Sequence, residues 1–153
     1  MQLNKFASIP HPAADYAADY LEATRRIAAW PGNGTSNIID PCQVQFLTHQ
    51  DKAERAIVLF HGYTACPDQF YRLGTTFHNL GYNVLIPRMR YHGRRDRLTS
   101  SQARLTAATL VAVANDAVDI AHGLGRQVQV MGLSMGGVMA AWVAQNRADV
   151  ERV

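Results

Sequence analysis

From residue 56 to residue 146, three predicted strands alternate with three predicted helices, and this order constrains the fold more than any other feature. Residues 56–60 and 83–86 are short apolar runs, as expected of strands that are buried on both faces. From residue 42 onward the predicted elements are a strand at 42–48, a strand at 56–60, a helix at 68–80, a strand at 83–86, a helix at 101–123, a strand at 127–131 and a helix at 134–146. This alternation predicts an α/β fold, a mainly parallel sheet of right-handed βαβ units with helices on both faces.

A separate helical segment precedes the predicted sheet. Apolar side chains recur at helical spacing over residues 12–30. Residues 31–34, with the sequence PGNG, are expected to end that helix. We therefore divide the chain into an N-terminal helical extension, 1–40, and a domain that occupies 41–153.

Composition places the chain among ordinary globular proteins. Of its 153 residues, 48% are hydrophobic and 18% are charged, which excludes collagen-like chains, disulfide scaffolds and highly charged disordered chains. No run approaches ~18 uninterrupted apolar residues, so no membrane-spanning helix is expected. The first thirty residues carry several charges and leave no apolar core for a signal peptide.

Cys42 and Cys66 are the two cysteines of the chain. Two are too few for a disulfide framework, so their number favours a reducing, cytoplasmic setting, and a single disulfide is left open. No cluster of His, Cys and Asp has the spacing of metal ligands, and we expect neither a metal nor an organic cofactor.

Five arginines lie between residues 88 and 97, in a chain with a net charge of +3. Such a run is typical of a patch for nucleic acid or an anionic substrate, or of a solvated loop. Asp96 interrupts the run, and no recognised nucleic-acid-binding module surrounds it. We expect a solvated loop and no nucleic-acid partner.

Gly132-x-Ser134-x-Gly136 stands between a predicted strand and a predicted helix. This is the pattern of a nucleophile elbow, in which a serine is held on a sharp strand-to-helix turn. Glycine at 132 and 136 relieves crowding around the turn, and Gly137 is expected to let the helix lie close. The turn would hold the Ser134 hydroxyl at a helix N-terminus, where the helix dipole favours developing negative charge.

Two other interpretations of this segment fit less of the pattern. A tight strand-to-helix turn with a helix-capping serine would leave Ser134 without a chemical role. A phosphate-binding loop fails on spacing, because the segment has neither the G-x-G-x-x-G pattern nor the lysine of the Walker pattern.

The loop that follows strand 56–60 carries the sequence His61-Gly62-Tyr63-Thr64, and it is expected at the same sheet edge as Ser134. Together these two loops resemble the α/β-hydrolase superfamily, particularly its small carboxylesterases and monoacylglycerol-lipase-like members. The resembling segments are 59–64, 81–88 with His92-Gly93, and 132–137. They fall within residues 56–146 and follow the superfamily's order, whereas residues 1–40 carry no such likeness.

The resemblance implies a role for each residue of the two loops. Ser134 would be the nucleophile that attacks an acyl carbonyl. The backbone N–H groups of Met135 and Tyr63 would be the oxyanion donors, each worth about 2.7–4 kcal/mol in acyl transfer. His61 and Gly62 would shape the oxyanion loop, and His61 would not act as the base.

A triad acid and a triad histidine are not found after the serine. The superfamily's order is Ser, then Asp or Glu, then His, but no histidine follows Ser134, and the acidic residues after it are Asp149 and Glu151. His92 is expected to be structural. We therefore expect the domain to be truncated after the nucleophile helix, with its acid and histidine beyond residue 153, and this chain alone to be inactive.

The resemblance implies a serine hydrolase that acts on small carboxylic esters or thioesters through an acyl-enzyme on Ser134. A non-catalytic fragment or binding module remains an alternative, as does an acyltransferase or a peptidase with the same fold. Strand 127–131 lacks an expected neighbour, so its apolar edge is predicted to promote self-association.

Overall fold

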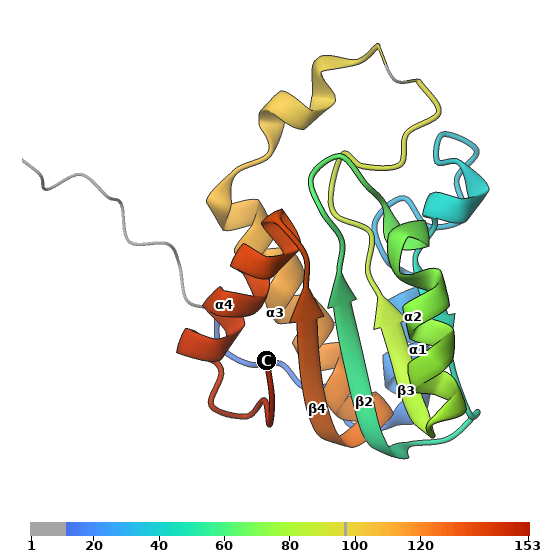
Figure 1. The fold of residues 1–153 in the computed structure, drawn as a ribbon, viewed down its shortest axis with the longest axis vertical. Helices are drawn as coiled ribbons and strands as arrows, with labels where there is room; N and C mark the ends of the chain where they lie inside the picture. The colour runs from blue at the N-terminus through green and yellow to red at the C-terminus, as the bar shows by residue number, and fades with distance from the viewer. Residues whose placement is uncertain (1–11, 97) are drawn as a thin grey trace, which may run out of the picture.

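A four-stranded sheet in the order β1-β3-β2-β4 is the centre of the fold (Figure 1). The structure is a computed structural model that describes residues 12–96 and 98–153. Its strands are β1 (Gln45–Leu47), β2 (Ala53–Phe60), β3 (Tyr82–Ile86) and β4 (Gly125–Gly132). β2 pairs in parallel with β3 and β4, and β1 pairs antiparallel with β3, so the prediction of a mainly parallel sheet is confirmed.

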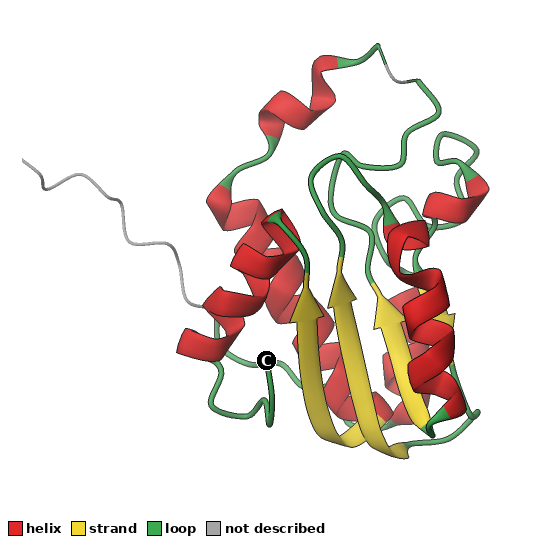
Figure 2. Ribbon diagram, viewed as in Figure 1, coloured by secondary structure: helices red, strands yellow, loops and turns green. Residues whose placement is uncertain are grey.

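Helices cover both faces of this sheet (Figure 2). They are α1 (Tyr20–Ala28), α2 (Tyr71–Asn79), α3 (Ala107–Leu124) and α4 (Met135–Asn146), with short 3-10 turns η1 (Asp40–Cys42), η2 (Pro67–Phe70) and η3 (Ser100–Arg104). Side chains alternate along β2: Val58 and Phe60 pack into one cluster with α1, α3 and α4, whereas Ile57 and Leu59 pack into another cluster that Phe77 of α2 joins. This alternation gives the sheet a core on each side.

The N-terminal helix is shorter than the predicted 12–30, because α1 begins at Tyr20. Asp19 caps it, and the side chain of Asp19 accepts a backbone N–H of the first turn at 2.8 Å. The preceding residues are instead held against α3, where the Asp15 N–H donates to the Asp119 carboxylate at 2.9 Å. Periodicity alone does not reveal this competing contact.

The predicted helix at 101–123 is divided in the same way. η3 ends at Arg104, Leu105 is extended, and α3 begins at Ala107. Thr106 is the cap residue, and its hydroxyl accepts the Thr109 N–H at 3.2 Å. The predicted helix at 68–80 likewise consists of η2 followed by α2.

A buried ion-pair network joins three distant segments. Arg147 donates to Asp119 of α3 and to Asp149, both at 2.7 Å, and to the Asn115 side chain at 2.5 Å. Asp119 also receives the Asp15 N–H described above. Removing one partner from such a buried pair costs about 3–5 kcal/mol, because the other charge is left without a partner. The network therefore anchors both the N-terminal segment and the segment after α4.

Cys42 and Cys66 form a disulfide between η1 and the loop before η2. The sequence left this possibility open. Disulfides persist mainly in oxidising compartments, so the number of cysteines no longer supports a cytoplasmic setting. A cytoplasmic location stays a prediction.

Among the helices of residues 12–96 and 98–153, none has the length and the apolar composition that a membrane span requires.

The arginine-rich segment is not solvated throughout, contrary to expectation. Arg88 is only 5% exposed, and its guanidinium donates to the backbone carbonyls of His92, at 3.0 Å, and of Pro31. Burial lowers the pKa of Arg88, and the charges of Arg94 and Arg90 act in the same direction. Arg90, Arg94 and Arg95 are exposed as expected, and Arg97 lies outside the described residues.

β4 lies at one end of the sheet, and the last residues of the chain begin to pair along its outer edge. The Val130 N–H donates to the Arg152 carbonyl at 2.9 Å, and the Glu151 N–H donates to the Val128 carbonyl at 2.8 Å. These bonds form a short parallel bridge. The edge is therefore partly covered, which differs from the fully unpaired edge that we expected.

Self-association through this edge stays a prediction. Met131 of β4, Leu133 of the turn and Val138 of α4 are exposed apolar residues, and Val138 is 68% exposed. We expect gel filtration of the chain to show a species larger than a monomer, because apolar surface near a partly covered edge still favours association. Val138→Lys is expected to shift the protein toward the monomer, and Ala112→Lys on the exposed side of α3 is the matched control. A clean monomer of the unchanged chain would contradict the prediction.

Candidate active site

Ser134 occupies the sharp turn between β4 and α4, where the sequence placed it. Its backbone has φ 56° and ψ −120°, a strained conformation for a residue other than glycine. The residue is exposed. The Leu133 N–H donates to the Phe60 carbonyl at 3.1 Å, which continues the pairing of β2 with β4 into the turn.

Two glycines allow the backbone to pass through this turn. A Cβ at position 136 would lie 1.9 Å from the Phe60 carbonyl oxygen, and one at position 132 would lie 2.0 Å from the Gly136 oxygen. Neither position has room for a side chain, as the elbow pattern predicts. Gly137 differs from our expectation, because a Cβ there would make an ordinary contact, 3.5 Å from the Gly132 oxygen.

Met135 is the first residue of α4. The backbone N–H groups that bond within the turn belong to residues that follow Met135. The Gly136 N–H donates to the Leu133 carbonyl at 2.9 Å, and the Val138 N–H donates to the Ser134 carbonyl at 3.2 Å. A first-turn N–H such as that of Met135 has no acceptor within its own helix. The N-terminus of α4 thus offers a hydrogen-bond donor directly beside Ser134.

The loop after β2 lies next to the serine. A Cβ at Gly62 would lie 3.6 Å from the Ser134 Cβ and 3.7 Å from the Leu133 carbonyl oxygen. Two segments that are about seventy residues apart in sequence therefore meet at the carboxyl edge of the sheet (Figure 1). The structure brings together the two loops that the sequence singled out.

Hydrogen bonds fix the orientation of the peptide group between Gly62 and Tyr63. The Gly62 carbonyl accepts the Ala65 N–H at 3.2 Å and faces the His61 Nδ1 at 2.9 Å. In a trans peptide the N–H points opposite to the carbonyl, so the Tyr63 N–H is directed away from the His61 ring. This loop thus presents a second donor whose direction is set by its neighbours.

Gln69 also holds this loop, and the sequence gave no signal for it. Its side-chain oxygen accepts the Gly62 N–H at 2.8 Å. Because the Gly62 N–H is occupied, it is not available to a substrate. A glutamine in a 3-10 turn is not part of any motif in the sequence, so its role emerges only from the fold.

His61 is fully buried, and both of its ring nitrogens are engaged. Nδ1 donates to the Gly62 carbonyl, and Nε2 accepts the Met89 N–H at 3.2 Å, which fixes the tautomer. Burial lowers the pKa of His61 to about 4. The ring is therefore neutral at pH 7, and it has no free nitrogen with which to deprotonate Ser134.

His92 is buried as well, and it joins the loop after β2 to the arginine-rich segment. Its ring nitrogens lie 2.7 Å from the Tyr63 carbonyl and 2.9 Å from the Arg90 carbonyl. These contacts are those of a residue that supports the loops. The structural role predicted for His92 agrees with this geometry.

The remaining histidines of the described residues lie at the opposite edge of the sheet. His78 lies in the last turn of α2, before β3, and the His49 ring stacks on it with 4.1 Å between centroids. His122 lies in the last turn of α3, before β4, and is 2.7 Å from the Asp149 carboxylate. Within residues 12–96 and 98–153, no histidine with a free ring nitrogen accompanies Ser134.

Asp149 has a structural role, because its carboxylate bonds to Arg147 and His122. The hydrogen bond from Arg147 holds the pKa of the Asp149 carboxyl well below its usual range, and the bond to His122 acts in the same direction.

Across the part of the chain that the structure describes, no group of three or more His, Cys, Asp or Glu residues is placed to hold a metal ion.

Substitution at Gly136 tests the close approach in the turn. Gly136→Ala is expected to lower the free energy of unfolding by at least about 2 kcal/mol, because its Cβ would overlap the Phe60 carbonyl. Gly137→Ala is the control and should be neutral or stabilising by up to about 1 kcal/mol, because alanine favours a helix. Urea denaturation measures both, and equal losses would contradict the proposed packing.

The burial of neutral His61 predicts a pH dependence of stability. The unfolded chain binds a proton near pH 6.5, whereas folded His61 does so near pH 4. Stability is therefore expected to fall as the pH drops from 6.5 to 4, by up to about 3 kcal/mol, and to be unaffected by this group above pH 6.5. Chemical denaturation across this range measures the slope. An unchanged slope in His61→Asn would show that another group is responsible.

Comparison with known proteins adds family membership to this geometry. A family model described as the alpha/beta hydrolase fold matches residues 55–153. A thermostable monoacylglycerol lipase from Bacillus sp. (strain H-257) is 28% identical over 94 residues, which are 61% of this chain and 36% of the lipase. The chain thus spans about a third of that relative's length.

A solved structure from work on the metagenome-derived lipolytic enzymes LipS and LipT is 24% identical, with a TM-score of 0.49, and the match covers 70% of this chain and 41% of that one. The family model, in contrast, includes the loop after β2, the serine turn and all of α4. Since that match extends over well more than half of the residues, this chain belongs to the family with the α/β-hydrolase fold.

Proposed function

We propose that this protein is a serine hydrolase that cleaves carboxylic esters or thioesters through an acyl-enzyme on Ser134. The observation that carries the proposal is the strained, exposed serine turn, which lies next to the loop that carries Gly62. The matching relative is named a monoacylglycerol lipase, which supports a small acyl ester as the class of substrate.

In this mechanism the Ser134 Oγ attacks the acyl carbonyl carbon, and the carbonyl oxygen becomes an oxyanion. The N–H groups of Met135 and Tyr63 would donate hydrogen bonds to that oxyanion, and the N-terminus of α4 adds its dipole. The fixed Gly62–Tyr63 peptide supports this role, because a donor held in place before the reaction needs no reorganisation during it.

The proposal also requires a general base and an acid from outside these 153 residues. A serine hydroxyl keeps its proton at neutral pH and is a weak nucleophile without an adjacent base. His61, His92 and His122 are engaged in other hydrogen bonds, and the acid and histidine of the superfamily follow the serine in chain order.

The need for a base from outside these residues favours one alternative, a binding module that keeps the fold without catalysis. It would use the carboxyl edge of the sheet as a surface and would need no base. An acyltransferase or a peptidase would share the Ser134 chemistry and differ in the acceptor or in the bond that is cleaved.

We expect the 153-residue chain alone to hydrolyse p-nitrophenyl acetate very weakly, with kcat lower by roughly 10⁴-fold or more than that of an enzyme with a full triad. Ser134→Ala is the matched variant. Rapid turnover that disappears in Ser134→Ala would refute the predicted inactivity and would show that a base is already present.

The nucleophile itself is tested by a fluorophosphonate probe on the protein expressed from its intact open reading frame. Covalent labelling at Ser134 that Ser134→Ala abolishes is the expected result. Gly137→Ala should retain labelling, since a side chain fits there. A folded protein that the probe does not label would favour the binding module.

A further inference from the structure

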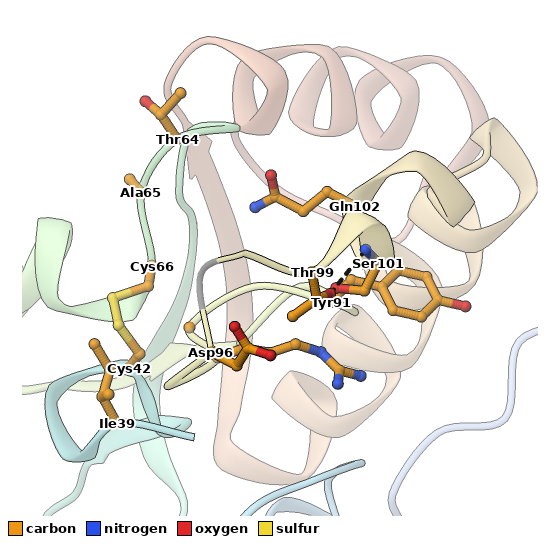
Figure 3. Close-up of a pocket in the computed structure, with 12 residues that line it drawn as sticks. Ile39, Cys42, Thr64, Ala65, Cys66, Tyr91, Asp96, Thr99, Ser101 and Gln102 are labelled. Atoms are coloured by element: carbon orange, nitrogen blue, oxygen red, sulfur yellow. Dashed lines mark hydrogen bonds between the residues drawn. A yellow bond between two sulfur atoms is a disulfide. The ribbon is translucent and has the colours of Figure 1, made fainter. Parts of the chain in front are cut away.

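A cavity of about 370 Å³ lies at the carboxyl edge of the sheet, next to the loop that carries Tyr63 (Figure 3). Thr64, Ala65 and Cys66 form one side of it, and the opposite side is formed by Tyr91, Gly93, Arg94, Asp96, Thr99, Ser101 and Gln102. Its volume is within the range of small-molecule sites, roughly 300–1,000 Å³. Ser134 does not line it, so this cavity is not the site of the chemistry proposed above.

The Cys42–Cys66 disulfide is part of the cavity wall (Figure 3). Cys66 is half-buried, whereas Cys42 is only 4% exposed and lies under Gly93, where a Cβ would come within 3.4 Å of the Cys42 sulfur. Of the two cysteines, Cys66 is therefore the more exposed to a molecule that enters the cavity.

The cavity also carries one charge of each sign. Arg94 and Asp96 both line it, both are exposed, and neither forms an ion pair with another residue of the described ranges. One Asp96 carboxylate oxygen accepts the Leu98 N–H at 2.9 Å. An exposed guanidinium and an exposed carboxylate without an ion-pair partner among the described residues are complementary to a ligand with a carboxylate and an ammonium group.

We propose that this cavity binds a small thiol that carries a carboxylate and an ammonium group, such as a cysteine-containing peptide, and that the thiol exchanges with the Cys42–Cys66 disulfide. Arg94 holds the carboxylate of the thiol and Asp96 its ammonium group. The disulfide in the wall is the group that reacts.

The exchange replaces the bond between Cys42 and Cys66 with a bond between Cys66 and the sulfur of the ligand. The thiolate sulfur of the ligand attacks the Cys66 Sγ, the bond between the two cysteine sulfurs breaks, and Cys42 leaves as a thiolate that takes a proton from water. The products are a mixed disulfide at Cys66 and a free thiol at Cys42. The reaction removes the covalent link between η1 and the loop that follows Tyr63.

Mass spectrometry after incubation with reduced glutathione identifies the product. We expect one glutathione per chain, bound at Cys66, and a free thiol at Cys42 that an alkylating reagent then labels. An adduct at Cys42, or no adduct while the disulfide is reduced by a neutral dithiol, would overturn the proposal.

Three small thiols separate charge recognition from simple access to the disulfide. Arg94→Ala is expected to slow exchange with 3-mercaptopropionate, which carries only a carboxylate, about threefold to fivefold, the value of one exposed charge pair. Asp96→Asn should slow cysteamine, which carries only an ammonium group, by a similar factor. Neither change should affect neutral 2-mercaptoethanol, which also verifies that each variant keeps its fold.

Arg126→Ala is the control for net charge, since Arg126 is exposed at the amino end of β4, and it should leave all three rates unchanged. Equal slowing of all three thiols by Arg94→Ala, or no slowing of any, would show that the cavity does not recognise these charges. Each of these rates is independent of whether Ser134 is a nucleophile.

Discussion

The close approach of two backbones at the carboxyl ends of β2 and β4 is the constraint on which the rest of the structure depends. Gly136 lies against the Phe60 carbonyl so closely that no side chain fits between them, and the Leu133 N–H bonds to that same carbonyl. This approach bends the chain at Ser134 and forces a positive φ there. It also places the start of α4 beside the loop that begins at His61.

The architecture of the sheet was predictable from local pattern. The apolar runs at 56–60 and 83–86 fall within β2 and β3, and the segment before Gly132 is β4, as predicted. Such runs are informative because parallel strands are buried on both faces. The glycines at 132 and 136 were likewise predictable, because the serine turn requires small residues at those two offsets.

Contacts between distant segments account for what the sequence did not reveal. Periodicity overextended the first helix, since it cannot detect that Asp119 binds the backbone near Asp15. Charge patterning placed Arg88 in solvent, yet backbone carbonyls surround its guanidinium. The positions of Gln69 and the pairing of the two cysteines depend in the same way on three-dimensional proximity.

The N-terminal helical segment covers part of the core of the residues that match the family model. Ala23, Ile27 and Trp30 are buried in the same cluster as α3, and the Trp30 indole donates to the Arg88 carbonyl at 2.9 Å. A protein trimmed to residues 55–153 would lose this apolar cover together with β1. The residues that match the family model therefore share their core with residues that precede them, and the boundary of the match in sequence is not a boundary in space.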